Sequence, residues 1–383
     1  VEYVRGIQVI KIFNLVVESF ERLYKSIIRY SEVVNKECQM CRRPYVIFQV
    51  CMLSLSALIV PVSYVAMPKS PHASETISLV VFFASFSGLL MSAFMKVMFF
   101  SKNFEMANDA ISKLESLFDE MDKNKLAHGD VSEMANHDIE FAGVTFRYEE
   151  GVDVLTDFSL KLESGKKYAL VGSSGSGKST IAKLISGFYP VSSGELKIGG
   201  VDISKYKRET LEHEIAFVFQ NAKLFKTSIY ENVKIGRPDA SREEVIKALD
   251  LAMCGSILDK FETREDTIIG AKGVHLSGGE TQRIAIARAI LKDAPIIILD
   301  EASAASDPEN EYEMQQAFSK LMEGKTVIMI AHRLSSIRNV DEILVVEDGK
   351  VTERGSHDEL IAKDSKYKNL QNLYNQANEW RLS

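Results

Sequence analysis

The fold is decided by Gly172-Ser173-Ser174-Gly175-Ser176-Gly177-Lys178-Ser179-Thr180, which fits the pattern G-x-x-x-x-G-K-[ST]. The run 166–171 before it is typical of a buried strand, and Ile181–Ser186 after it has a helical pattern. Glycines let the backbone curl so that its N–H groups surround a phosphate, at a helix N-terminus whose dipole favours anions. Lys178 can then reach the β- and γ-phosphates of a nucleotide, and the Ser179 hydroxyl can ligate Mg²⁺. A flexible Gly/Ser turn is the alternative, and the flanking strand and helix argue against it.

A second apolar strand ends in two acids. Pro295-Ile296-Ile297-Ile298-Leu299 closes on Asp300-Glu301. Such a run suits a central parallel strand whose carboxyl edge faces a nucleotide. Paired with the phosphate loop, Asp300 is expected to hold Mg²⁺, directly or through water, and Glu301 to activate the attacking water. Without that loop, two adjacent acids would indicate only a solvated strand end.

Between these motifs lies a second glycine turn. It reads Leu276-Ser277-Gly278-Gly279-Glu280 and precedes a helical pattern over Ile284–Leu291. By the same dipole argument it is a second anion site. A single nucleotide bound to one subunit needs only one phosphate-binding turn. We therefore expect two subunits to pair head to tail, so that each turn closes over the γ-phosphate of the other and a twofold dimer with two composite sites results.

Two stretches in the first third of the chain are apolar enough to cross a membrane. Tyr45–Met67 has 23 residues without a charge, and Ile77–Met95 has 19. A bilayer core of ~30 Å needs about 20 apolar residues as a helix, so both qualify. A pair of buried helices in a soluble domain is the alternative, but such helices normally show a polar stripe. Lys and Arg flank the two outer ends, which places these ends and everything after Lys102 in the cytoplasm, with the link 68–76 outside.

Charge and cysteine content exclude several classes of protein. Residues 1–137 carry 14 Lys+Arg and 14 Asp+Glu, whereas residues 138–383 carry 32 and 39, so the net charge of −7 belongs to the second part. We therefore expect no nucleic-acid partner bound through a broad basic surface. Four cysteines in 383 residues exclude a disulfide scaffold. Cys38 and Cys41 lie in a helical pattern with no second pair, so we expect them to serve neither redox chemistry nor zinc.

Together the motifs resemble those of ATP-binding cassette (ABC) transporters, specifically exporters whose membrane and nucleotide-binding domains are fused. Gly172–Thr180 is similar to the Walker A motif, Ile296–Asp300 to the Walker B motif and Leu276–Glu280 to the signature motif. These three motifs share the order that they have in the family, and the resemblance covers nearly the whole chain.

The resemblance implies roles for four further residues. By position, Tyr148 stacks on adenine, and Gln220 is the Q-loop residue that contacts Mg²⁺ and signals to the membrane domain. His332 falls at the switch histidine that contacts the γ-phosphate. Asp307 ends the D-loop, which crosses the dimer interface.

The resemblance also sets the domain boundaries. Glu2–Lys11 looks like the cytoplasmic loop of an exporter's fourth helix, with a coupling helix, so the two spans are the fifth and sixth of six. Because the chain begins at Val1 without a methionine, we expect it to begin part-way through a larger protein. The predicted fold class is an α/β P-loop NTPase cassette, a mixed sheet with a helical subdomain, preceded by all-α transmembrane helices. The expected domains are the C-terminal part of the transmembrane domain at 1–121, a linker at 122–138 and a nucleotide-binding domain at 139–383. The first of these contains a coupling region at 1–34, spans at about 45–67 and 77–100, and a cytoplasmic helix extension to 121. The nucleotide-binding domain contains a helical subdomain at about 221–291.

The sequence departs from the family pattern in three places. The signature ends in Glu280 where Gln is more usual, although Ser277 and the glycines are intact. The D-loop reads Ala304-Ala305-Ser306-Asp307 instead of Ser-Ala-Leu-Asp, which can alter cross-talk between the two sites. Gly270-Ala271-Lys272-Gly273 lacks the glutamate usual in exporters, which affects the contact with coupling helices. The Glu-ended signature and Asp307–Glu311 are similar to a subgroup that contains siderophore-handling transporters with an exporter fold.

The resemblance implies ATP hydrolysis, with ATP and Mg²⁺ as cofactors, coupled to transport of a solute by one half of an exporter-type dimer. The implied catalytic residues are Glu301, His332 and Gln220, and the implied metal-binding residues are Ser179, Gln220 and Asp300. The expected partners are a second half-transporter, identical or different, that supplies its signature motif in trans, the lipid bilayer, and a small solute, lipid, peptide or siderophore. The expected location is the cytoplasmic membrane, multi-pass, with the nucleotide-binding domain in the cytoplasm. The alternatives are an exporter-fold importer of a siderophore and a soluble, non-transport ABC ATPase.

Overall fold

The computed structural model describes residues 21–66, 73–123, 125–148, 151–270, 274–300, 308–331 and 337–382. The chain divides into two compact units, residues 1–118 and 119–383. The described part of unit 1 consists of long helices. Unit 2 contains all the described strands.

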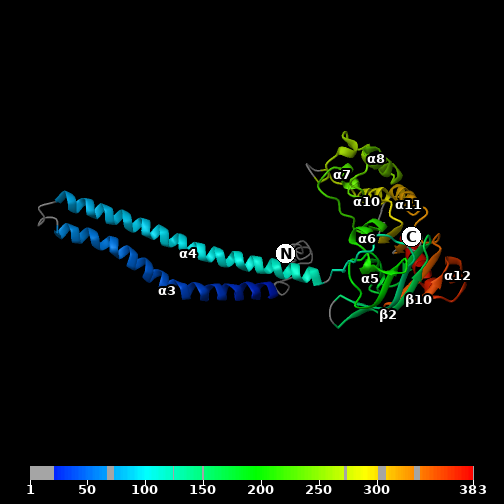
Figure 1. The fold of residues 1–383 in the computed structure, drawn as a ribbon, viewed down its shortest axis with the longest axis horizontal. Coiled ribbons are helices and arrows are strands. Elements are labelled where there is room, and N and C mark those ends of the chain that lie inside the picture. The colour runs from blue at the N-terminus through cyan, green and yellow to red at the C-terminus, as the bar shows by residue number, and fades with distance from the viewer. Residues whose placement is uncertain are drawn as a thin grey trace. The chain divides into compact units, whose positions relative to one another are not determined.

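Unit 1 is built from α3 (Glu21–Ala66) and α4 (Ala73–Lys123), which lie side by side as a hairpin in Figure 1. The two helices touch where the rings of Phe48 and Phe94 meet edge to face, with centroids 5.7 Å apart. Two prolines, Pro44 and Pro61, lie inside α3. Proline removes a backbone hydrogen bond in a helix, which is tolerated in a membrane span where neighbouring groups satisfy the freed carbonyl.

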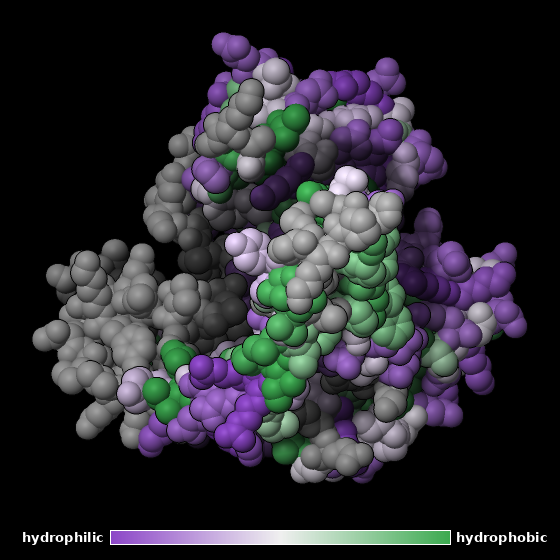
Figure 2. Space-filling view, turned by 90° about the vertical axis from the view of Figure 1, so that its left-hand side faces the viewer, coloured by the Kyte–Doolittle hydropathy of each residue, from purple (hydrophilic) through white to green (hydrophobic). Residues whose placement is uncertain are grey.

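The hairpin exposes large apolar side chains around its circumference. On α4 they include Phe82, Leu89 and Val97, each at least 60% exposed, and Figure 2 shows hydrophobic residues gathered along the two helices. Within the described residues, one segment, Ile77–Asp119, is long and apolar enough to cross a membrane. It contains the whole of the second predicted span. The first predicted span lies on α3 and is helical as expected, and its passage through a membrane stays a prediction.

Unit 2 contains two sheets. The smaller has the strand order β2-β1-β4-β5 and is antiparallel. The larger has the order β10-β9-β3-β8-β7-β6, in which β9, β3, β8, β7 and β6 pair in parallel and β10 pairs antiparallel. The strands are β1 (Ile139–Arg147), β2 (Asp153–Leu162), β3 (Lys167–Val171), β4 (Ser193–Ile198), β5 (Val201–Asp202), β6 (Ile215–Val218), β7 (Ile296–Asp300), β8 (Thr326–Ile330), β9 (Glu342–Glu347) and β10 (Lys350–Gly355). This is the mixed sheet that the sequence predicts.

The helices of unit 2 fall into two groups. Figure 1 shows α7 and α8 at the end of the unit away from β2 and β10, with α10 between. The helices are α5 (Lys178–Ile185), α6 (Arg208–Glu214), α7 (Ile229–Lys234), α8 (Arg242–Leu251), α9 (Gly255–Leu258), α10 (Gly278–Lys292), α11 (Pro308–Leu321), α12 (His357–Ala362) and α13 (Lys366–Leu382), with 3₁₀ turns at Ile203–Lys205 and Arg264–Asp266. The group α7–α10 occupies the stretch that the sequence assigns to a helical subdomain.

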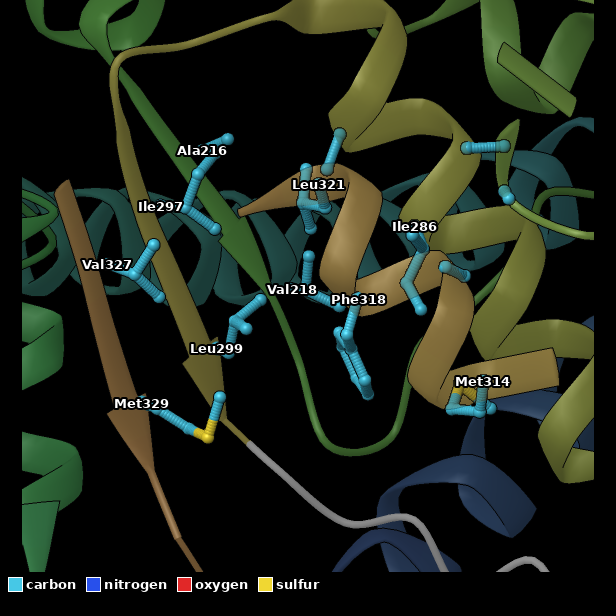
Figure 3. Close-up of a cluster of buried hydrophobic side chains, with 14 of the residues drawn as sticks. Ala216, Val218, Ile286, Ile297, Leu299, Met314, Phe318, Leu321, Val327 and Met329 are labelled. Atoms are coloured by element: carbon cyan, nitrogen blue, oxygen red, sulfur yellow. The ribbon is translucent and has the colours of Figure 1, made fainter. Parts of the chain in front are cut away.

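The large sheet is buried on both faces, because successive side chains of a strand point to opposite sides. On β3, Ala169 and Val171 enter one hydrophobic cluster, whereas Tyr168 and Leu170 enter the other. Figure 3 shows the first cluster, in which Ile286 of α10 and a row of side chains from α11 pack over β6, β7 and β8. The labelled members of that cluster are Ala216, Val218, Ile286, Ile297, Leu299, Met314, Phe318, Leu321, Val327 and Met329.

Two segments at the ends of unit 2 are held by contacts with the rest of that unit. Part of the expected linker binds the cassette, because the Gly129 and Lys207 N–H groups donate to the Tyr206 and Val131 carbonyls at 3.1 and 2.8 Å. At the other end, Tyr367 of α13 is fully buried. Its hydroxyl lies 2.8 Å from Nδ1 of His357 on α12, and burial raises the pKa of Tyr367 to about 12.

Candidate nucleotide-binding site

The predicted phosphate loop joins β3 to α5, as its strand–turn–helix pattern requires. Gly172 has φ +146° and Gly177, the residue that caps α5, has φ +103°. At Gly172 a Cβ atom would lie 2.1 Å from the carbonyl oxygen of Val346 on β9, so only glycine fits there. Ser173, Ser174 and Gly175 are exposed at the tip of the loop. The loop is therefore anchored against the sheet on one side and open on the other.

Lys178 points back into this loop. Its ammonium donates to the carbonyl oxygens of Gly172 and Ser173 at 2.9 and 2.6 Å, and to Oγ of Ser176 at 3.2 Å. Burial lowers the pKa of Lys178, and the negative charge of Asp300 partly offsets that shift. A desolvated cation within a curled, glycine-rich turn fits a bound phosphate, because the charge is screened little by water. The loop residues thus fit the group that the sequence predicts.

The first turn of α5 carries the other polar groups of the loop. The Ser179 side chain is exposed, while Thr180 is buried with its hydroxyl 3.2 Å from the hydroxyl of Tyr148. The Tyr148 ring is 43% exposed and meets Tyr189 edge to face at 5.3 Å. Lys183 Nζ lies 5.6 Å from the centroid of the Tyr148 ring. An aromatic ring with an open side next to the phosphate loop is suited to stacking on a nucleotide base.

Asp300 reaches the same edge of the sheet as the loop. On β8, Ile330 pairs with both Leu170 of β3 and Asp300 of β7, so the acid stands two strands from the start of the loop. Asp300 and Gln220 line one cavity of about 870 Å³, which is also lined by residues of β6 and α10. Mg²⁺ is usually bound through one or two carboxylates together with substrate phosphates. A hydroxyl at Ser179 and a carboxylate at Asp300 fit that donor set.

Three predicted residues lie outside the described part of the chain. They are Glu301, Asp307 and His332, and their roles stay predictions. Within the described residues, no cluster of three or more His, Cys, Asp and Glu side chains is arranged to hold a metal ion. That arrangement is not needed for a cation held mainly by phosphate oxygens and water.

The signature turn forms the N-terminus of α10. Ser277 is the N-cap: its Oγ accepts from the Glu280 N–H at 3.3 Å, and the Glu280 carboxylate accepts from the Ser277 N–H at 2.7 Å. This reciprocal pair is a capping box. Gly278 is exposed, and a Cβ atom there would meet nothing within 4 Å. No hydrogen bond or ion pair in the described part of the chain joins this turn to the phosphate loop.

The signature helix is instead connected to the predicted Q-loop. Nε2 of the buried Gln282 donates to the carbonyl oxygen of Phe219 at 3.2 Å, directly before Gln220. A second connection was not evident from the sequence. Lys260, in the turn after α9, forms an ion pair with the carboxylate of Glu280. No motif marks Lys260, because it lies 20 residues before its partner.

Residues 155–304 match the family described as ABC transporter. Residues 155–304 of this chain therefore form an ABC transporter domain. Its phosphate loop, Asp300 and signature turn all fall within the matched range, so the predicted family, the fold class and the prediction of an ATPase domain are confirmed. Nucleotide binding follows from the domain.

The chain is similar to a flippase and to a putative export protein. It is 47% identical over 237 residues to an ATP-dependent lipid A-core flippase of Pasteurella multocida (strain Pm70), an alignment that covers 61% of this chain and 41% of that protein. It is 45% identical over 238 residues to the putative multidrug export ATP-binding/permease protein YgaD of Bacillus subtilis (strain 168), covering 62% and 41%. These alignments span about two fifths of the length of the curated relatives.

A solved structure matches almost the whole chain. It is that of a bacterial Atm1-family ABC exporter with ATP bound, with a TM-score of 0.67 and 27% sequence identity. The match covers 97% of this chain and 64% of that chain. It therefore includes the α3–α4 hairpin as well as the cassette, and the fused arrangement predicted from the sequence is that of an exporter half.

Proposed function

We propose that this chain is part of one half of an ABC exporter, in which ATP hydrolysis at a dimer interface drives an apolar or amphipathic molecule out across the cytoplasmic membrane. One observation carries the proposal: a single chain joins a phosphate loop and a signature turn to helices with apolar side chains around their circumference. A soluble ATPase has no use for such helices, because exposed apolar patches of this extent promote aggregation in water.

The proposed chemistry assigns each part of the site one task. The loop around Gly172 and the Lys178 ammonium bind the β- and γ-phosphates, while Tyr148 stacks on the base. Ser179 and Asp300 hold Mg²⁺, which when bound neutralises charge on the phosphates. Glu301 accepts a proton from the attacking water, and His332 and Gln220 orient the γ-phosphate and the water.

The second set of tasks belongs to the partner. A signature turn from the other subunit covers the γ-phosphate with the N-terminal end of its α10. Because Gln282 of α10 holds the backbone beside Gln220, movement of the signature helix reaches the segment that faces the cavity of about 870 Å³. We propose that this segment passes the change to the membrane helices, which then reorient.

Export of an apolar or amphipathic molecule agrees with the similarity to two transporters. One relative is an ATP-dependent lipid A-core flippase, and another is a putative multidrug export protein. The relatives thus favour export over the siderophore import and the soluble ATPase that the sequence leaves open.

The test is transport by the full-length dimer in proteoliposomes with the cassettes facing outward. We expect ATP added outside to drive accumulation of a fluorescent amphipathic probe in the lumen. Glu301→Gln should retain ATP binding and lose hydrolysis and accumulation by at least about 100-fold, the usual contribution of a catalytic base. Glu195→Gln, an exposed carboxylate on β4, is the matched control.

Three outcomes would contradict the proposal. ATP-dependent loss of the probe from a preloaded lumen would indicate an importer. Partition of the full-length protein into the aqueous fraction without detergent would indicate a soluble ATPase. Near-normal turnover by the Glu301→Gln dimer would overturn the assignment of the base.

A further inference from the structure

The signature turn contains an electrostatic conflict. Glu280 stands at the third position of α10, in the same turn as Ser277 and Gly278. The N-terminal end of a helix attracts a phosphate, but a carboxylate in that turn repels it. Burial strengthens this repulsion, because Glu280 is only 6% exposed and water screens its charge little.

The structure shows how this carboxylate is held. One oxygen accepts from the Ser277 N–H at 2.7 Å, and the other receives the ammonium of Lys260. Burial acts to raise the pKa of Glu280, but the hydrogen bond from Lys260 and that from the Ser277 N–H outweigh it and hold the pKa below its ordinary value. Glu280 is therefore ionised at neutral pH, and its charge is matched by that of Lys260.

Lys260 is placed by the fold and not by the signature motif. It follows α9, whose Ile257 and Leu258 side chains are buried in the hydrophobic core, and its own N–H donates to the Ile257 carbonyl at 3.3 Å. The neighbouring Asp259 is engaged by Arg264. The backbone at 260 is thus fixed, while 58% of the Lys260 side chain remains exposed. A flexible stem on a fixed backbone can keep the ammonium over Glu280.

We propose that Lys260 is a positioning residue for the signature turn: it neutralises Glu280 and holds that carboxylate in the capping box, so that a signature ending in Glu can accept the γ-phosphate of the partner's nucleotide. The proposal rests on the proposed function, because the phosphate in question belongs to the composite site. Lys260 acts through Glu280 and does not touch the nucleotide.

On this proposal, the effect of substituting Lys260 depends on which residue occupies position 280. With Lys260 removed, the charge of Glu280 is uncompensated at the place where a multiply charged anion must bind. With Gln at position 280 the capping box is kept, because an amide oxygen can accept from the Ser277 N–H, and there is no charge to neutralise. Lys260 should therefore matter when residue 280 is Glu and not when it is Gln.

The test is a double-mutant cycle in the full-length dimer, with ATP hydrolysis measured against ATP concentration. We expect Lys260→Met to raise KM for ATP about 5- to 10-fold, the size of one uncompensated charge near a partly exposed site. Glu280→Gln removes the buried charge and is the reference for the double variant. The double variant should match Glu280→Gln, because the coupling is measured by the failure of the two effects to add. Lys260→Arg should behave as the wild type.

A control and a salt series separate this role from a general structural one. Lys247→Met removes an exposed lysine from α8 in the same helical group and should leave KM unchanged. Added salt should reduce the defect of Lys260→Met, because screening weakens the repulsion. A Lys260→Met defect that Glu280→Gln does not relieve would overturn the proposal in favour of a structural role, and an unchanged KM would overturn it outright. Absence of ATP hydrolysis from the wild-type dimer would instead contradict the proposed function.

Discussion

At the scale of single residues, Tyr148 shows how one side chain can serve two purposes. Its ring is partly exposed beside the phosphate loop, while its hydroxyl lies 3.2 Å from Oγ1 of Thr180 on α5. We propose that the ring stacks on adenine, while the hydroxyl ties the ring to the first turn of α5. The two contributions can be separated by substitution.

We predict that Tyr148→Ala raises KM for ATP about 10-fold or more, because stacking on a base is worth on the order of 1–3 kcal/mol. Tyr148→Phe keeps the ring and removes one hydrogen bond, so it should change KM by no more than about 3-fold. Both should be measured by steady-state ATP hydrolysis of the full-length dimer, with the thermal midpoint as a check on folding. Equal effects of the two substitutions would argue against stacking.

The place of a residue in the fold could be predicted from the sequence where the signal is local. Lys178, Ser179 and Thr180 follow one another in a motif, and the structure places them at the start of α5 as the spacing requires. The pair Lys260–Glu280 could not be foreseen, since it depends on how α9 packs beside the start of α10. A side-chain pair of this kind is set by tertiary packing and leaves no periodic signal in the sequence.

At the scale of elements, the unit β3–loop–α5 was predictable because each part has its own signal. A short apolar run predicts the strand, glycines predict the turn, and apolar spacing after Thr180 predicts the helix. The order of strands in the large sheet was not predictable. It depends on crossovers between segments far apart in sequence, such as β3 next to β8 and β9. The contact of the segment 129–131 with residues 205–207 was hidden for the same reason.

Two glycines of the loop allow the strand–turn–helix geometry to be tested. Gly172→Ala places a Cβ atom 2.1 Å from the Val346 carbonyl oxygen, whereas at Gly175, with φ +83°, a Cβ atom meets nothing within 4 Å. We predict that Gly175→Ala lowers the thermal midpoint by about 2–4 °C through backbone strain alone. Gly172→Ala should lower it by at least about 5 °C and also weaken ATP binding, because β9 or the loop must move.

The measurement is thermal unfolding of the full-length protein at one fixed scan rate, together with ATP affinity. A fixed rate matters because membrane proteins often unfold irreversibly. If Gly172→Ala were tolerated as well as Gly175→Ala, the loop would not be anchored against β9 in the way that the close approach to Val346 requires.

At the scale of the whole molecule, the net negative charge lies in the part of the chain that contains both sheets. Residues 1–137 are neutral overall and contain the apolar hairpin, whereas residues 138–383 carry all of the net charge of −7 and contain both sheets. The cassette holds a phosphate loop and a signature turn, and no hydrogen bond or ion pair among the described residues joins them. We propose that a charged unit with these two elements pairs with a second copy or a related subunit.

This arrangement makes a prediction that depends on which chain carries which defect. In a composite site, the phosphate loop of one chain meets the signature turn of the other. Lys178→Ala and Gly278→Asp on the same chain, paired with a wild-type chain, should therefore disable both sites. The same two substitutions placed on opposite chains should leave one site with both parts intact, and that dimer should keep measurable ATP hydrolysis. Lys178→Ala removes the loop's buried cation, and Gly278→Asp adds a negative charge to the exposed signature turn.

The measurement uses two differently tagged full-length copies, co-expressed and purified through both tags, with ATP hydrolysis compared at equal protein. If each chain instead held its nucleotide alone, the result would reverse. The pair with both defects on one chain would retain one working site, and the pair with the defects divided would retain none. Lys178→Ala opposite an unaltered chain is the reference, because it should lose one site under either arrangement. Only a shared site keeps activity when the two substitutions are divided between the chains and loses it when one chain carries both.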